Sequence, residues 1–160
     1  MPPTHTTHTT NTTNTTNTTD APAPAGARPF REGLVSLKPP RLLGSRCGAC
    51  ATTTFPPRQF CPACRAVDGL ERTALDTRGR IHSFTVVRQA PPGVAVPYIL
   101  AWVDVPADQV RLMSTVVGVE PEAVELGLPV ELELTPFATG DDGAELLGFR
   151  FRASTTGATA

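Results

Sequence analysis

The sequence predicts a mainly β protein in which a small zinc ribbon precedes a five-stranded barrel. Two C-x-x-C pairs, Cys47-Gly-Ala-Cys50 and Cys61-Pro-Ala-Cys64, predict the ribbon. Seventeen prolines and thirteen glycines in 160 residues favour short strands joined by turns over long helices. Apolar and polar residues alternate over several stretches of the second half, a pattern typical of strands with one buried face.

The four cysteines are the only ones in the chain, and their spacing suits four thiolates around one tetrahedral zinc ion. Residues 51–60, between the pairs, are enough for a strand, a turn at Pro56-Pro57 and a return. Because four protein ligands saturate the ion, we expect a structural zinc and no catalytic residue at this site. Two disulfides or a thioredoxin-like redox pair are the alternatives. A redox motif needs only one C-x-x-C pair, and the absence of a recognisable signal peptide favours a reducing, cytoplasmic location.

The chain divides into five segments by composition. Residues 1–27 are a Thr-rich repeat without large apolar side chains after Met1, so we expect a disordered low-complexity tail. Residues 28–38 place apolar residues at a helical spacing and predict a short helical lead-in, too short to be stable alone. We expect the zinc ribbon over 39–69, the barrel over 70–152 and a loose tail over 153–160.

The barrel region is expected to hold five strands, with one helical turn at Glu120–Glu125 between the third and the fourth. The expected strands are Arg80–Gln89, Tyr98–Val105, Arg111–Val117, Leu128–Thr135 and Leu146–Arg152. A further run, Leu70–Asp76, precedes them. This order is typical of a Greek-key barrel of the OB type, whereas a sandwich usually needs about seven strands. Trp102, the single tryptophan, lies in an apolar strand and is expected in the core.

Charge is distributed unevenly along the chain. From Arg28 to Arg88, eleven basic residues oppose four acidic ones, a net charge of +7 before the zinc site contributes about −2. From Gln89 to the end, three arginines oppose ten acidic residues, a net charge of −7. A basic ribbon end suits a phosphate-bearing ligand or an acidic partner, and simple solvated charge is the alternative. No apolar run is long enough to span a membrane.

Several spaced motifs together resemble the DUF35 family, two-part proteins with an N-terminal rubredoxin-like zinc ribbon and a C-terminal acyl-CoA-associated OB-fold. The motifs are Arg46–Cys50, Phe55–Arg58, Cys61–Cys64, Gly79–Val87, Pro97–Tyr98 and Glu125–Val130, in the family's order. The resemblance covers about 30–152. One departure is Ala51, where the family often has glycine after the first C-x-x-C pair.

The resemblance implies a non-catalytic accessory subunit in a hetero-oligomer. It implies a thiolase-like or MaoC-type hydratase partner whose acyl-CoA substrate the complex binds or channels. Residues that we expect to contact CoA phosphates or the partner are Arg41, Arg46, Phe55, Arg58 and Arg80.

Two other functions fit parts of the sequence. Zinc ribbons and OB-folds also bind single-stranded nucleic acid, but such binding needs a basic groove, and the barrel half is acidic. An enzyme in its own right would have to use His82, with Ser83 and Thr85 nearby, because the cysteines are committed to zinc. Both functions fit the sequence less well than the accessory role.

Overall fold

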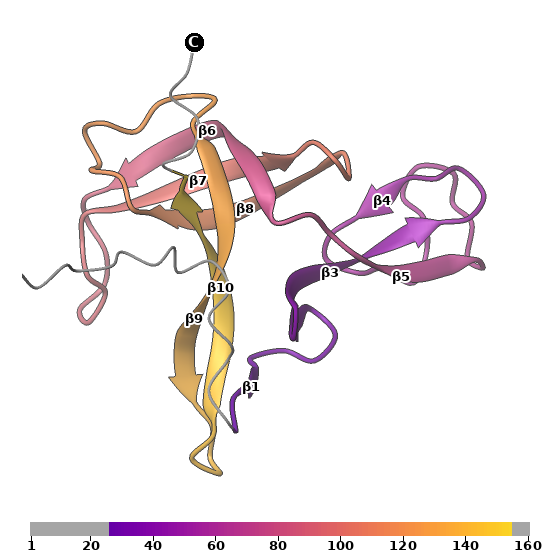
Figure 1. Ribbon diagram of the computed structural model, residues 1–160, viewed down its shortest axis with the longest axis horizontal. Coiled ribbons are helices and arrows are strands. Elements are labelled where there is room, and N and C mark those ends of the chain that lie inside the picture. The colour runs from indigo at the N-terminus through magenta and orange to yellow at the C-terminus, as the bar shows by residue number, and fades with distance from the viewer. Residues whose placement is uncertain (1–25, 155–160) are drawn as a thin grey trace, which may run out of the picture.

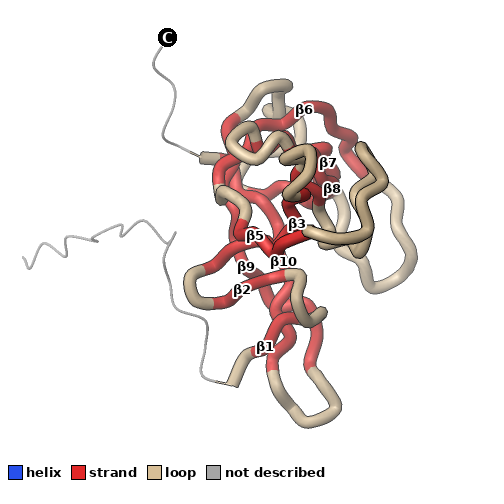
Figure 2. Tube along the Cα trace, turned by 90° about the vertical axis from the view of Figure 1, so that its right-hand side faces the viewer, coloured by secondary structure: helices blue, strands red, loops and turns tan. Residues whose placement is uncertain are grey.

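The computed structural model describes residues 26–154, and this part of the chain consists of strands, turns and loops. Figure 2 shows no helix in the described residues, and none of them forms a helix that could cross a membrane. The predictions for residues 1–25 and 155–160, which cover most of both expected tails, lie outside this range. The ten strands divide between a barrel and a smaller ribbon, which lie beside each other in Figure 1.

Five strands close into a barrel. They are β6 (Arg78–Val87), β7 (Tyr98–Val105), β8 (Val110–Val117), β9 (Pro129–Thr139) and β10 (Glu145–Ala153). The first three form an antiparallel meander. Closure comes from β9, which pairs with both β6 and β10, and from a short parallel pairing between β10 and β8. The predicted OB-type barrel is therefore confirmed. Beyond the barrel, the β9–β10 hairpin continues outward, where β1 (Arg28–Pro29) pairs with β10.

The ribbon is built around one strand, β3 (Pro40–Cys47). Strands β2 (Val35–Leu37), β4 (Thr53–Thr54) and β5 (Leu70–Ala74) all pair antiparallel with it. The run at residues 70–76 thus joins the ribbon sheet, although its sequence position suggested the barrel region. Its pairing with β3 fixes the chain on both sides of the cysteine turns.

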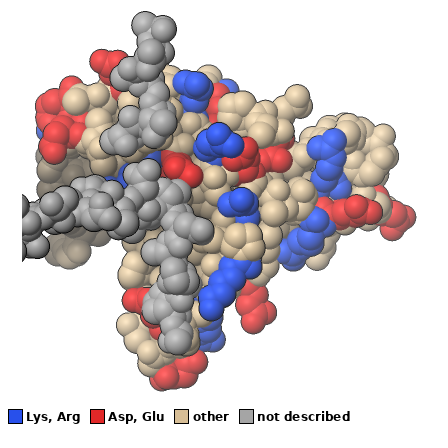
Figure 3. Space-filling model, in the orientation of Figure 1, with Lys and Arg blue, Asp and Glu red and all other residues tan. Residues whose placement is uncertain are grey.

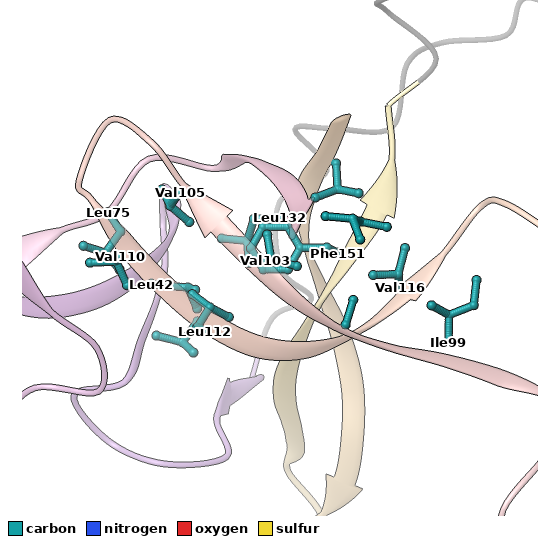
Figure 4. Close-up of a cluster of buried hydrophobic side chains, with 14 of the residues drawn as sticks. Leu42, Leu75, Ile99, Val103, Val105, Val110, Leu112, Val116, Leu132 and Phe151 are labelled. Carbon is teal, nitrogen blue, oxygen red and sulfur yellow. The ribbon is translucent and has the colours of Figure 1, made fainter. Parts of the chain in front are cut away.

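A continuous hydrophobic core joins the two parts. Leu42 of β3 and Leu75, just after β5, are fully buried and belong to the same cluster as Val105, Val110 and Leu112 of the barrel. Figure 4 shows these side chains gathered at one end of the β7–β8 pair. The amide of Asp76 also donates a 2.6 Å hydrogen bond to Asp108 Oδ2 in the β7–β8 turn. Full burial of one Leu or Val side chain contributes roughly 1.5–3 kcal/mol to stability, so the shared core holds the ribbon against the barrel.

Two helical predictions were wrong. Residues 28–38 form β1, a turn and β2 in place of a helix, because β10 and β3 offer strand partners at both ends. Glu120–Glu125 forms a turn closed by the Ala123 amide on the Glu120 carbonyl, and not a helical turn. Both segments are too short for helix propensity to outweigh tertiary contacts.

The prediction for Trp102 was also wrong, because its side chain lies on the outer face of β7 and is 43% exposed. Alternate residues of β7 are buried, and Ile99, Ala101 and Val103 occupy the inward positions. Residues 98–103 are all apolar or aromatic, so hydrophobicity alone did not reveal which set points inward.

Candidate metal centre and ribbon surface

The two C-x-x-C segments form equivalent turns. In the first, the Ala51 amide donates to the Cys47 carbonyl at 2.8 Å, and the Cys47 amide donates to the Thr52 carbonyl at 2.9 Å. In the second, the Arg65 amide donates to the Cys61 carbonyl at 2.9 Å. The Cys61 amide correspondingly donates to the Ala66 carbonyl at 2.8 Å. These hydrogen bonds tighten each turn, so that both sulfurs of a pair point the same way.

The four sulfurs converge on one point. All four Sγ atoms lie within 4.8 Å of one another, with 3.7 Å between Cys47 and Cys64 and 3.5 Å between Cys50 and Cys61. A tetrahedron with Zn–S distances of about 2.3 Å has edges of about 3.8 Å, close to these separations. A disulfide needs about 2.05 Å, and all four cysteines are free thiols in this structure. The donor set and its size therefore fit one zinc ion.

Burial differs within each pair in the same way. The first cysteine, Cys47 or Cys61, is buried, whereas the second, Cys50 or Cys64, is exposed. The Thr52 hydroxyl oxygen lies 3.2 Å from Cys50 Sγ, and hydrogen bonds from the Thr52 side chain and backbone lower the pKa of Cys50 to about 6. The Ala66 amide favours the Cys64 thiolate, but the Cys50 sulfur and desolvation outweigh it and raise the pKa of Cys64 to about 12. The two exposed sulfurs of the site thus have pKa values shifted in opposite directions.

A saturated site of this kind gives the zinc a structural role. Four sulfur ligands leave no open coordination position for water or substrate. The strand that carries Cys47, β3, also carries Leu42, which lies in the shared core. The ion would thus fix the two turns to the strand that anchors the ribbon on the barrel.

A hydroxyl network supports the hairpin between the two turns. Ser45 is buried, its Oγ lies 2.9 Å from Thr54 Oγ1, and it accepts the Arg58 amide at 3.0 Å. This network and Thr52 were missed in the sequence analysis. The sequence contained the signal, since Thr52–Thr54 follow the first cysteine pair after Ala51 and hydroxyl side chains commonly bond to nearby backbone.

The four arginines predicted to contact phosphate do not converge on one spot. Arg41 and Arg46 lie an odd number of residues apart on β3, so their side chains leave opposite faces. The Arg41 guanidinium donates to the Pro40 carbonyl, whereas Arg46 lies 3.4 Å from Thr53 Oγ1. Arg80, on the barrel, donates to the Gly127 carbonyl at 3.3 Å. Arg58 is exposed directly after the hairpin turn.

Among the described residues, the basic side chains of the ribbon have no carboxylate within salt-bridge distance. All ion pairs within residues 26–154 join side chains that lie outside residues 30–75. The basic residues without such a partner are Arg31, Lys38, Arg41, Arg46, Arg58, Arg65 and Arg72, of which Arg41 and Arg72 donate to backbone carbonyls. In Figure 3, Lys and Arg side chains extend from the ribbon towards the β9–β10 hairpin, with acidic side chains between them. This surface has cationic groups free to pair with an anion.

Phe55, the predicted partner contact, is half-buried. Its ring packs edge-on against Phe149 of β10, with 5.8 Å between the ring centroids, and it joins the edge of the shared core. The buried part of the Phe55 side chain thus serves the packing between ribbon and barrel.

Comparison with known proteins covers both parts of the chain. The family model described as the ChsH2 rubredoxin-like zinc ribbon domain matches residues 36–71, and that of the ChsH2 C-terminal OB-fold domain matches residues 72–135. A DUF35 domain-containing scaffold protein of Methanocaldococcus jannaschii is 32% identical over 114 residues, which span 69% of this chain and 80% of that protein. The chain belongs to the DUF35 family. The resemblance seen in the sequence is therefore confirmed, and with it the zinc ribbon and its single structural zinc.

Other relatives of this DUF35 protein are named as enzyme subunits. Benzoylsuccinyl-CoA thiolase subunit BbsA of Geobacter metallireducens is 30% identical over 113 residues, which span 71% of this chain and 75% of that subunit. A "Probable enoyl-CoA hydratase alpha subunit" of Thermomonospora curvata is 34% identical, over 70% of this chain but 35% of that longer protein. A solved structure titled "Ltp2-ChsH2(DUF35) aldolase" matches with a TM-score of 0.58 and 31% identity. That match covers 71% of this chain and 84% of the solved one.

Proposed function

We propose that this DUF35 protein is a non-catalytic accessory subunit of an acyl-CoA-processing complex. It binds a thiolase-like or MaoC-type hydratase partner and helps to bind or channel the acyl-CoA substrate. The observation that carries this proposal is the similarity, over about 70% of the chain, to proteins named as a thiolase subunit and a hydratase subunit.

The chemistry of the described residues supports a non-catalytic role. The zinc site is saturated by its four sulfurs, so it offers no Lewis acid to a substrate. His82, the one histidine in the described range, already has its Nδ1 3.0 Å from Arg111 Nη2 and 3.3 Å from Asp104 Oδ2. A general base needs a nucleophile or substrate proton within hydrogen-bond reach, and the charged neighbours of His82 supply neither.

The basic ribbon supports a contact with the CoA moiety. The phosphates of CoA are the part of an acyl-CoA that a guanidinium recognises best. Arg46 and Arg58 lie near the same ribbon hairpin, are exposed, and have no carboxylate partner. These two residues are our candidates for the phosphate contact, while Arg41 and Arg80 already bond to backbone carbonyls.

The proposal is tested by co-expressing the full chain with thiolase-like and MaoC-type subunits encoded beside its gene, one at a time. We expect one of them to co-elute with this chain in size-exclusion chromatography, and its KM for acyl-CoA to rise when this chain is left out. Turnover of an acyl-CoA by this chain alone, or no complex with any of these subunits, would contradict the proposal.

The phosphate contact is tested in the reconstituted complex. Arg46→Ala and Arg58→Ala are expected to raise KM for an acyl-CoA several-fold each and to leave KM for the matching acyl-pantetheine unchanged, because acyl-pantetheine lacks the nucleotide phosphates. Arg78→Ala is the matched control, since Arg78 is highly exposed on the barrel and lies beside Asp76. An equal effect of all three variants would show that CoA phosphates are not recognised at the ribbon.

A further inference from the structure

The outer face of the β6–β7–β8 meander carries no charged side chain over most of its length. The strand register places Ser83, Trp102 and Met113 side by side, and the next outward rows follow along Ser83–Val87, Tyr98–Trp102 and Met113–Val117. None of the nine outward residues in these three ranges is acidic or basic. By contrast, the outward residues of β9 and β10 include Glu133, which pairs with two arginines. Charge depletion on one exposed sheet face is a feature of interface cores.

Large apolar side chains stand in the middle of this uncharged face. Trp102 is 43% exposed and Met113 is 47% exposed, and they are direct cross-strand neighbours. Leu100, in the next row, is half-buried. Tryptophan and methionine are enriched in protein interfaces, and tryptophan is among the residues that contribute most to their affinity.

The uncharged surface continues into the β6–β7 loop. No charged residue occurs from Gln89 to Val103, and every residue of Pro91–Pro97 is exposed. Val94 and Val96 present half or nearly half of their surface to solvent. An exposed loop normally carries polar side chains, so this loop extends the apolar face beyond the strands.

Most charges at the edges of the face are already paired, and Arg80, which lies opposite Asp104 in the strand register, donates to the Gly127 carbonyl. At one end, the extra residue of a β-bulge, His82, lies beside Asp104, which forms a 2.6 Å ion pair with Arg111 Nε. Near the other end, Arg88 pairs with Glu122 at 3.0 Å. A surface that is uncharged at its centre and whose rim charges are mostly paired suits another uncharged protein surface better than it suits a phosphate group.

The size of the face indicates which kind of partner covers it. Its nine strand positions and the seven loop residues Pro91–Pro97 make sixteen residues, fewer than the roughly 20–30 that each side of a standard interface contributes. A twofold contact between two copies of this chain, centred on Trp102, would use only these sixteen residues of each copy, fewer than a standard interface contains. A larger partner can extend beyond Asp104 and contact the ribbon as well, which enlarges the interface. The ribbon lies next to this end of the face because the Asp76 amide donates to Asp108 in the β7–β8 turn.

We propose that the outer face of β6–β7–β8, centred on Trp102 and Met113, docks against an uncharged apolar surface of the catalytic partner subunit. This inference rests on the proposed function and adds the surface that makes the contact. It assigns Trp102 the role of the buried anchor and the loop Pro91–Pro97 that of its apolar extension.

The experiment uses the full chain, with zinc, and the co-expressed subunit that co-elutes with it. Because the chain has a single tryptophan, labelling it with fluorotryptophan gives one fluorine NMR signal from Trp102. We expect the signal to shift when the unlabelled subunit is added and to lose its sensitivity to a soluble paramagnetic quencher. We also expect Trp102→Glu and Met113→Glu to raise the Kd of the complex at least about thirtyfold, as loss of an interface hot spot does.

Leu126→Glu is the matched control, since Leu126 is 67% exposed and lies outside the face. It is expected to change the Kd less than about twofold, as a substitution outside the interface core does. A complex that forms with an unchanged Trp102 signal, and with equal affinity for Trp102→Glu, would overturn the docking face but leave the proposed function intact. Self-association that Trp102→Glu abolishes would overturn it in favour of a second copy. No complex with any candidate subunit would overturn both proposals.

Discussion

Ala51 and Arg65 occupy the same position in the two cysteine turns. Each directly follows a C-x-x-C pair, each donates its amide to the carbonyl of the first cysteine, and each has a left-handed backbone, with φ of 59° and 65°. Neither residue is glycine, although a left-handed backbone costs an L-residue roughly 1–2 kcal/mol. Each turn therefore contains a strained backbone residue, and the same turn directs two sulfurs towards one ion.

Replacing Ala51 with glycine is expected to stabilise the zinc-bound protein by about 0.5–1 kcal/mol, because relief of the left-handed strain exceeds the larger chain entropy that glycine brings to the unfolded state. Chemical denaturation of the zinc-loaded protein measures the change. Ala49→Gly is the control, since Ala49 lies in the same turn without a positive φ, and it is expected to destabilise slightly. Equal effects of the two substitutions would show that strain at Ala51 is negligible.

Removal of zinc is expected to unfold the ribbon and leave much of the barrel folded. Structural zinc in small domains contributes on the order of 10–16 kcal/mol, more than the ribbon's few core side chains supply. The barrel closes through its own five strands and does not need β3–β5 for its hydrogen bonding. Hydrogen exchange after chelation should show lost protection in β3–β5 and retained protection in β6–β10, reversed by added zinc. Full protection of β3–β5 in protein shown to be metal-free would contradict this.

Gly79→Ala is expected to destabilise the barrel by roughly 1–3 kcal/mol, the usual cost of overpacking. A Cβ at this position would stand 2.5 Å from Val103 Cγ1 and 2.9 Å from the Asp104 carbonyl oxygen, and the backbone oxygen cannot easily move away. The control is Gly148→Ala, whose Cβ would meet the side chain of the exposed Phe137 at 3.3 Å and should cost much less. Thermal unfolding of both variants measures the difference.

Glu133→Gln is expected to lower the stability at pH 7 by about 1–2 kcal/mol, because the hydrogen bonds from two charged groups are weakened. Arg150 donates to Glu133 at 2.8 Å and Arg152 at 2.6 Å, while the Nε of Arg150 is buried and has no hydrogen-bond partner within residues 26–154. Desolvation raises the pKa of Glu133, but the two arginines outweigh it and hold the pKa below its usual value.

The pH dependence follows from that lowered pKa. The stabilisation by Glu133 is fully present above the pKa of an unfolded-state glutamate, about 4.3, and is lost as the pH falls through the lower folded-state pKa. The stability difference between wild type and Glu133→Gln should therefore shrink on acidification. Glu120→Gln, at an exposed residue without an ion pair, should show no comparable difference at either pH. A difference that is constant with pH would exclude the ion pairs as its cause.

The zinc site and the barrel strands were predictable because each depends on a local pattern. The four cysteines allow one arrangement around a tetrahedral ion, and the alternation of Val130, Leu132 and Leu134 with Glu131 and Glu133 defines both a strand and its buried face. Such signals survive folding because metal geometry and the two-residue period of a strand do not depend on the rest of the chain.

Other features were settled by contacts between segments distant in sequence. Residues 28–38 became two short strands because β10 and β3 supplied partners, and Leu70–Ala74 joined the ribbon because β3 was free to pair with it. Trp102 faces outward because the barrel core is filled by the residues on either side of it, which an all-apolar segment does not reveal. The sequence by itself determined the metal ligands, the barrel strands and the family. Only the tertiary structure decided which apolar residues were left on the surface, because that depends on which strand faces enclose the core.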